Sequence, residues 1–203
     1  MLALDPDLVL TFSDLQADIV AGLIRAGVEV HAFNQRSIAG ILDMIRKVGC
    51  FVGAGQRAEA LVMQLAKRLE DVRGEADGAV ARPKVYFEEW DDPMISGIHW
   101  VSELIAIAGG ADIFPELATG KSATGRIVTI DQIIAAAPDI IIGSWCGKKF
   151  SPSRVAARTE FDVIPAVRTG RVHEIKSPII LQPGPAALTD GLDALVGIIR
   201  PEY

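Results

Sequence analysis

Acidic side chains gather in one short stretch of the chain, where they could do acid–base or metal chemistry. Glu88 and Glu89 stand directly before Trp90, and Asp91 and Asp92 follow it. Neighbouring carboxylates can share a proton in catalysis or hold a divalent cation. Catalysis would also require a partner nucleophile, a glycine-rich phosphate loop or a Ser/His/Asp ordering, and the sequence offers none of these. The stretch by itself therefore does not indicate catalysis.

Histidine and cysteine are the other candidate metal donors. His99 could be a metal ligand through a neutral imidazole, or it could cap the helix that follows it. Cys146 comes just after a probable strand and could contact a ligand or act as a soft metal donor. Neither Cys146 nor Cys50 belongs to a CxxC pair, so neither a zinc motif nor a disulfide framework is indicated. One alternative is an intracellular metal-binding protein or metalloenzyme that uses His99, Cys146 and the Asp91/Asp92 pair.

Aromatic side chains are further candidates for contact with a ligand. Trp90 and Trp145 both follow probable strands, and open α/β sheets bind ligands at that end of their strands. Trp100 begins a probable helix, where it contacts the ligand or packs in the core. Phe12 follows the first strand of the chain and, with Ser13, is the candidate contact from that region.

A strand-entry pattern that occurs twice predicts the elements that position these residues. It spans residues 4–11 (LDPDLVLT) and 137–143 (APDIIIG). Proline lacks an N–H group and disfavours a helical residue before it, and the short apolar run after it is typical of a buried parallel strand. Two copies predict two similar lobes.

Apolar periodicity and turn residues predict the remaining elements. A helix after residue 13 and a strand at 28–33 would complete one β-α-β unit with the first strand. The stretches 74–82 and 88–99 are expected to be loops. Further strands are expected at 84–87 and 171–175, and further helices at 37–48, 56–73, 100–108, from 129, and at 185–199.

Length and composition restrict the class of protein. The chain has 203 residues, half of them hydrophobic, which is enough for a sizeable core. Its net charge of −6 argues against nucleic acid as a partner, since a phosphate backbone requires a basic surface. Charged residues and glycines interrupt every apolar run before it reaches the roughly 20 residues needed to cross a bilayer.

Several motifs, in this order and spacing, resemble the cobalamin-binding type of ABC-importer substrate-binding protein, of the helical-backbone metal receptor group. Each motif alone is weak, and their order is far more specific. They are 90–93 (WDDP), 97–105 (GIHWVSELI), 108–110 (AGG), 164–172 (IPAVRTGRV), 182–185 (QPGP) and 190–192 (DGL).

The resemblance implies an α/β fold of two Rossmann-like lobes with parallel sheets, joined by a long rigid helix. The lobes would be 1–55 and 79–203, with the connecting helix and a loop at 56–78, and the first lobe would be incomplete at its N-terminal side. It also implies capture of a ligand without chemistry and delivery to a membrane permease. The ligand would be a corrinoid, or alternatively haem or a ferric siderophore, so no resident cofactor is required. Gln182, in the closing motif, joins the candidate ligand contacts.

The same resemblance leads to expectations about the compartment and the assembly of the protein. The first residues carry no basic segment and no apolar run of the signal-peptide type. The protein would be periplasmic or in the cell envelope if an export signal lies upstream, and cytoplasmic if Met1 is the native start. An incomplete first lobe would expose a sheet edge, through which a second copy could pair to form a homodimer.

Overall fold

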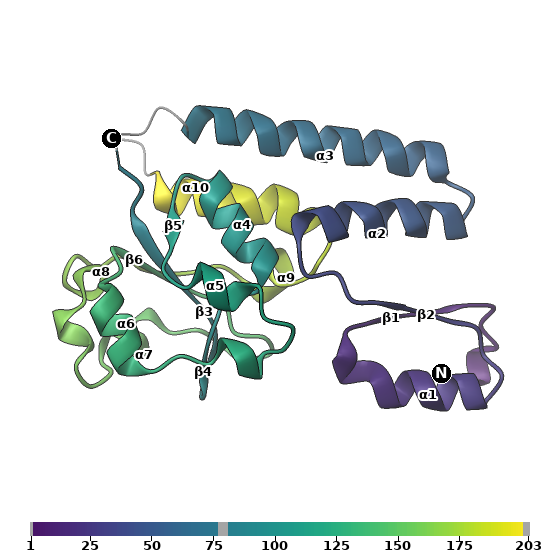
Figure 1. Ribbon diagram of the computed structural model, residues 1–203, viewed down its shortest axis with the longest axis horizontal. Helices are drawn as coiled ribbons and strands as arrows, with labels where there is room; N and C mark the ends of the chain where they lie inside the picture. The colour runs from purple at the N-terminus through teal and green to yellow at the C-terminus, as the bar shows by residue number, and fades with distance from the viewer. Residues whose placement is uncertain (1, 77–80, 201–203) are drawn as a thin grey trace. The chain divides into compact units, whose positions relative to one another are not determined.

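The computed structural model describes residues 2–76 and 81–200. Their contacts divide the chain into two compact units, Met1–Arg36 and Ser37–Tyr203. Both units combine helices with parallel strands (Figure 1), so the predicted α/β class is confirmed.

The first unit is a β-α-β unit, as predicted. Strands β1 (Val9–Phe12) and β2 (Val30–Phe33) pair in parallel. The one-turn helix η2 (Asp14–Gln16) and helix α1 (Ala17–Arg25) connect them. Gly27 has a φ of 79°, in the left-handed region that favours glycine, and so ends the helical run.

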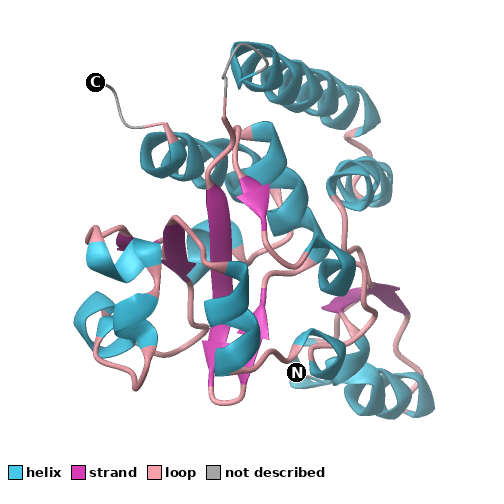
Figure 2. Ribbon diagram, turned by 60° about the vertical axis from the view of Figure 1, so that its left-hand side comes forward, coloured by secondary structure: helices cyan, strands magenta, loops and turns pink. Residues whose placement is uncertain are grey.

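A five-stranded sheet forms the centre of the second unit (Figure 2, magenta). Its order is β4-β3-β6-β7, and the short β5 pairs with β3 beside this path. β4 is antiparallel to β3, and the other pairs are parallel. The strands are β3 (Lys84–Asp91), β4 (Met94–Ser96), β5 (Ala111–Asp112), β6 (Ile140–Gly143) and β7 (Val172–Glu174).

Helices cover both faces of this sheet, which is why its central strands are buried. Figure 1 shows α4 and α10 on one side, and α6, α7 and α8 on the other. All four residues of β6 are buried. The helices of the second unit are α2 (Ile38–Phe51), α3 (Gly55–Ala76), α4 (His99–Ile107), α5 (Pro115–Ala118), α6 (Ile130–Ala136), α7 (Pro152–Ala156), α8 (Pro165–Arg168), α9 (Ser177–Ile180) and α10 (Leu192–Ile199), with short turns η3 (Thr124–Arg126), η4 (Phe161–Val163) and the π-helical η5 (Ala187–Gly191). The short turn η1 (Leu2–Leu4) lies in the first unit.

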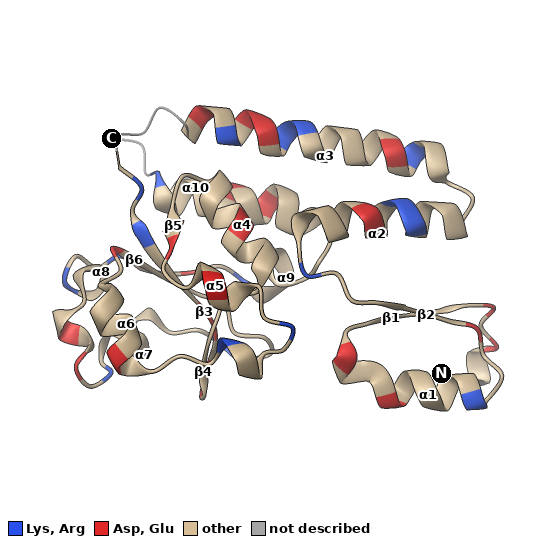
Figure 3. Ribbon diagram, viewed as in Figure 1, with Lys and Arg blue, Asp and Glu red and all other residues tan. Residues whose placement is uncertain are grey.

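Helices α2 and α3 pack closely against each other within the second unit. Gly49 permits this, because a Cβ atom there would collide with the Cβ of Ala58. Arg46 also binds Glu59 through two hydrogen bonds of 2.7 and 3.1 Å. Figure 3 shows both signs of charge along these two helices. The contacts thus group α2 with the second unit. The sequence predicts that the first lobe ends at residue 55, and this lobe boundary stays a prediction.

Two predicted loops differ from the structure. The loop expected at 88–99 is wrong in its first half, because β3 continues to Asp91 and turns into β4. Its carboxylates look like loop residues in the sequence, but arginines distant in the chain neutralise two of them. The loop expected at 74–82 begins later, since α3 runs to Ala76, and its residues 77–80 lie outside the described residues.

Candidate ligand-binding site

The carboxyl ends of β3 and β6 lie side by side in the second unit. Glu88 of β3 is paired with Gly143, the last residue of β6. Gly143 is required here, because the ring of Phe150 occupies the place of a Cβ atom. In parallel α/β sheets, this end of the strands is where ligands bind. The residues that follow the two strands therefore define the candidate site.

Glu88 forms the buried base of the site. Its side chain is fully buried and accepts hydrogen bonds from Arg158 at 2.6 and 2.9 Å, one to each carboxylate oxygen. Trp145 donates from Nε1 at 3.1 Å and Tyr86 from its hydroxyl at 3.2 Å. Burial opposes the charge of Arg158, but the hydrogen bonds and charge of Glu88 outweigh it and raise the pKa of Arg158. This cluster is fully paired and therefore structural.

Glu89, the next residue along β3, is held by a second arginine. Arg126, whose side chain is 2% exposed, donates to both of its carboxylate oxygens at 2.6 and 3.1 Å. Arg126 also donates to the carbonyl of Ser96. These bonds tie the β3–β4 hairpin to η3, so Glu89 too has a structural role.

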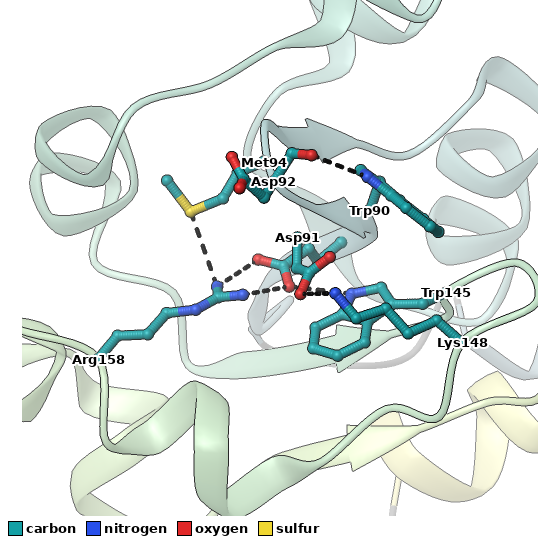
Figure 4. A network of polar contacts seen from close by, with 8 residues as sticks. Trp90, Asp91, Asp92, Met94, Trp145, Lys148 and Arg158 are labelled. Carbon is teal, nitrogen blue, oxygen red and sulfur yellow. Dashed lines mark hydrogen bonds and ion pairs between the residues drawn. The ribbon is translucent and has the colours of Figure 1, made fainter.

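Asp91 and Lys148 form a more open ion pair at the end of β3. Lys148 Nζ lies 2.5 Å from Asp91 Oδ2, and it lies 5.5 Å from the ring centroid of Trp90 and 5.2 Å from that of Trp145. The indole of Trp90 donates to the carbonyl of Asp92 at 2.9 Å. Figure 4 shows these side chains converging around the ammonium. The site thus combines an aromatic surface with a cation.

A cavity of about 590 Å³ opens beside this ion pair. It lies between the β3–β4 hairpin and the end of α7, and both charged and apolar groups line it. The lining residues are Asp91, Asp92, Pro93, Met94, Val128, Ile130, Arg154, Ala157, Arg158 and Thr159.

Three of the predicted residues lie at the end of β3 or β6. Trp90 is half-buried, so part of its ring is open to a ligand. Trp145 is 3% exposed, and its ring centroid lies 4.8 Å from that of Phe150. It therefore packs beneath the site and is covered from solvent. Cys146 follows it as an exposed free thiol.

The other predicted residues lie elsewhere. Trp100 is buried and donates from Nε1 to the carbonyl of Ile180 at 2.9 Å, which is the core role that the sequence left open. His99 begins α4 and is half-buried, and Gln182 is exposed after α9.

Phe12 and Ser13 lie in the first unit. Both side chains are half-buried there. The hydroxyl of Ser13 accepts a hydrogen bond from the backbone of Leu15 at 3.4 Å, while Phe12 donates from its backbone to Gln16 at 2.8 Å. Ser13 therefore caps η2.

Sequence reasoning missed Lys148 and Arg158. Lys148 had a usable signal, because it follows a buried strand in the same loop as Trp145 and Cys146. Arg158 had none, since it lies 70 residues from Glu88 in the chain.

The structure does not support the alternative metal site. Within residues 2–76 and 81–200, no group of three or more His, Cys, Asp and Glu side chains is arranged to hold a metal ion. His99, Cys146 and the Asp91/Asp92 pair therefore do not assemble into the centre that this alternative requires.

Comparison with protein families decides the class of protein. The model of the periplasmic binding protein family matches residues 1–179. The chain belongs to this family. It is a family of solute-binding proteins and not of enzymes. A search of curated proteins finds no match to this binding protein.

Solved structures share the fold of this binding protein. An ABC transporter substrate-binding protein from Listeria monocytogenes EGD-e is 18% identical, with a TM-score of 0.82 over 98% of this chain and 78% of that chain. A periplasmic heme-binding protein from Roseiflexus sp. RS-1 is 23% identical, with a TM-score of 0.78 over 98% of this chain and 79% of that chain. The periplasmic vitamin B12 binding protein of Vibrio cholerae is 20% identical, with a TM-score of 0.70 over 98% of this chain and 76% of that chain.

In the part of this binding protein that the structure describes, no helix has the length and apolar character needed to cross a membrane.

Proposed function

We propose that this protein is the substrate-binding component of an ABC importer, which captures a corrinoid and delivers it to a membrane permease. The observation that carries the proposal is the half-buried ring of Trp90 at the carboxyl end of a parallel sheet, beside Lys148. An indole face suits a macrocycle, and an ammonium suits its polar periphery. The fold it shares with an ABC substrate-binding protein and a vitamin B12 binding protein supports the proposal.

The division of labour along the chain is part of this proposal. A first lobe at 1–55 would contribute Phe12 and Ser13, and a second lobe at 79–203 would contribute the site around Trp90, with 56–78 as the connection. Cys146, exposed beside Trp145, is a further proposed contact, and so are Gln182 and His99. The metal would arrive with the ligand, so the protein itself requires no cofactor.

Haem is the second candidate ligand, and a ferric siderophore is the third. Lys148 favours haem because an ammonium can pair with a carboxylate of the macrocycle. The shared fold with a periplasmic heme-binding protein supports this candidate as well.

Isothermal titration tests the proposal directly. The full chain is titrated with cyanocobalamin, hemin and ferrichrome, beside a Trp90→Ala variant and a Met63→Ala control. Met63 lies on α3, where its side chain is 65% exposed, so its loss removes apolar surface away from the site. We expect saturable one-to-one binding of cyanocobalamin that Trp90→Ala weakens about tenfold, which corresponds to about 1.4 kcal/mol.

Other outcomes would change the proposal in defined ways. Binding of hemin or ferrichrome alone would keep the transport function and replace the corrinoid. Equal affinity of Trp90→Ala and wild type for cyanocobalamin would remove this face of the sheet from the site.

A further inference from the structure

One carboxylate oxygen of Asp91, a residue that lines the cavity beside β3, lacks a hydrogen-bond donor. The side chain of Asp91 is only 9% exposed, and its Oδ2 binds Lys148. Its Oδ1 is buried, and no group of the described residues donates to it. Buried polar atoms of native proteins nearly always have a partner. A donor from outside the polypeptide, either water or a group of a ligand, would complete the hydrogen bonding of this atom.

The same cavity also offers a hydrogen-bond donor that is not in use. Arg154 lies on α7 and lines the cavity with its exposed side chain. Within the described residues, its guanidinium has no hydrogen-bond or ion-pair partner, in contrast to that of Arg158, which is bound by Glu88. The residues that line the cavity thus include one acceptor without a donor, Asp91 Oδ1, and one exposed donor without an acceptor in the protein, the guanidinium of Arg154.

The charges around the cavity indicate that the missing group is neutral. Asp91 is balanced by Lys148 and Arg158 by Glu88. The remaining charges, those of Asp92 and Arg154, are opposite in sign. A carboxylate would bring no proton for Oδ1 of Asp91, and an ammonium would bring no acceptor for Arg154. A group with both functions and no charge meets both requirements.

We propose that this cavity is a subsite for a primary amide arm of the ligand. The amide N–H would donate to Asp91 Oδ1 and the amide oxygen would accept from Arg154, while Met94, Val128 and Ile130 would cover the methylene groups. A volume of about 590 Å³ accommodates such an arm. The inference rests on the proposed function and narrows it, because a corrinoid carries primary amides at its periphery and haem carries carboxylates.

Small probes test the subsite without the macrocycle. Two-dimensional ¹H–¹⁵N NMR spectra of the full chain are recorded during titration with propionamide and, separately, with propionate. We expect propionamide to shift the backbone N–H signals of Asp91, Asp92, Met94 and residues 154–159 with saturation in the millimolar range, and propionate to leave them in place. Shifts by propionate of equal size, or none with propionamide, would overturn the subsite and leave a water molecule at Asp91.

A matched pair of arginine variants extends the test to the macrocycle. Arg154→Met removes the donor, and Arg168→Met removes an exposed arginine at the end of α8. We expect Arg154→Met to abolish the propionamide shifts and to weaken cyanocobalamin about tenfold, with Arg168→Met unchanged. Cyanocobalamin binding that depends on Trp90 but not on Arg154 would overturn the subsite alone. Propionamide binding without cyanocobalamin binding would keep the subsite and overturn the corrinoid.

Discussion

Glu88 and Asp91 are carboxylates three residues apart on one strand, yet their surroundings differ completely. Glu88 is fully buried and accepts four hydrogen bonds, two of them from Arg158. Asp91 is nearly as buried but is held by Lys148 at one oxygen only. The difference teaches that burial alone does not identify a ligand contact. A fully paired carboxylate stabilises the fold, whereas an incompletely paired one is available for binding.

Removal of Glu88 should have the largest effect on stability. Glu88→Ala leaves Arg158, Trp145 and Tyr86 without their acceptor in the core, so we expect a loss of about 3–5 kcal/mol in the free energy of unfolding. Urea unfolding followed by circular dichroism measures it. The control is Glu70→Ala, at an exposed position of α3. A loss no larger than that of the control would mean that the cluster does not hold the fold.

A change at Gly143 disturbs the same cluster from the side of β6. The methyl group of Gly143→Ala would collide with Phe150, which packs on Trp145 at 4.8 Å. We expect a loss of about 1–3 kcal/mol from overpacking. Thermal unfolding measures this loss, and Gly22→Ala, where a Cβ meets open space, is the control. If Gly143→Ala were as stable as the control, Phe150 would have to lie elsewhere.

Removal of Lys148 tests the Asp91 half of the comparison. The side chain of Lys148 is 39% exposed, but that of Asp91 is 9% exposed and loses its ion-pair partner, so Lys148→Met should cost about 1–2 kcal/mol of stability, less than Glu88→Ala. Removal of the ammonium from the faces of Trp90 and Trp145 should change the tryptophan fluorescence. The neighbouring exposed Lys149→Met should leave the spectrum unchanged. A stability loss as large as that of Glu88→Ala would contradict the distinction between the two carboxylates.

The smallest expected effect is on the pH dependence of stability, and it comes from His173, which belongs to neither the Glu88–Arg158 nor the Asp91–Lys148 pair. Burial, followed by the charge of Arg171, lowers the pKa of His173 on β7 below its usual value of 6.5. The unfolded chain then binds protons more readily than the folded one, so the contribution to stability is complete above pH 6.5 and is lost as the pH falls through the lowered pKa. His173→Gln should flatten this decline in urea unfolding series below pH 6.5. An identical pH profile for wild type and variant would contradict the assignment.

Local patterns predicted the long elements well. The structure contains β6, which the proline-led run predicted, and α3, which the apolar spacing predicted. It also contains the predicted β-α-β unit of β1, α1 and β2. The short helices α5, α7, α8 and α9 were not predicted, because four or five residues do not complete a recognisable period. The β3–β4 hairpin was missed because its carboxylates suggested a solvated loop.

The sequence by itself determined the α/β class and the solute-binding role, since these depend on local runs and on motif order, while the contact of Trp90 with a ligand stays a prediction. The tertiary structure decided which charged residues meet. Glu88 finds Arg158 across 70 residues and Asp91 finds Lys148 across 57, and no periodicity records such pairs. It also decided which indoles are covered, because Trp100 and Trp145 are buried by elements distant in the chain. Burial and pairing are properties of the packed chain, so the same acidic stretch contains a structural anchor at Glu88 and the proposed ligand site at Asp91.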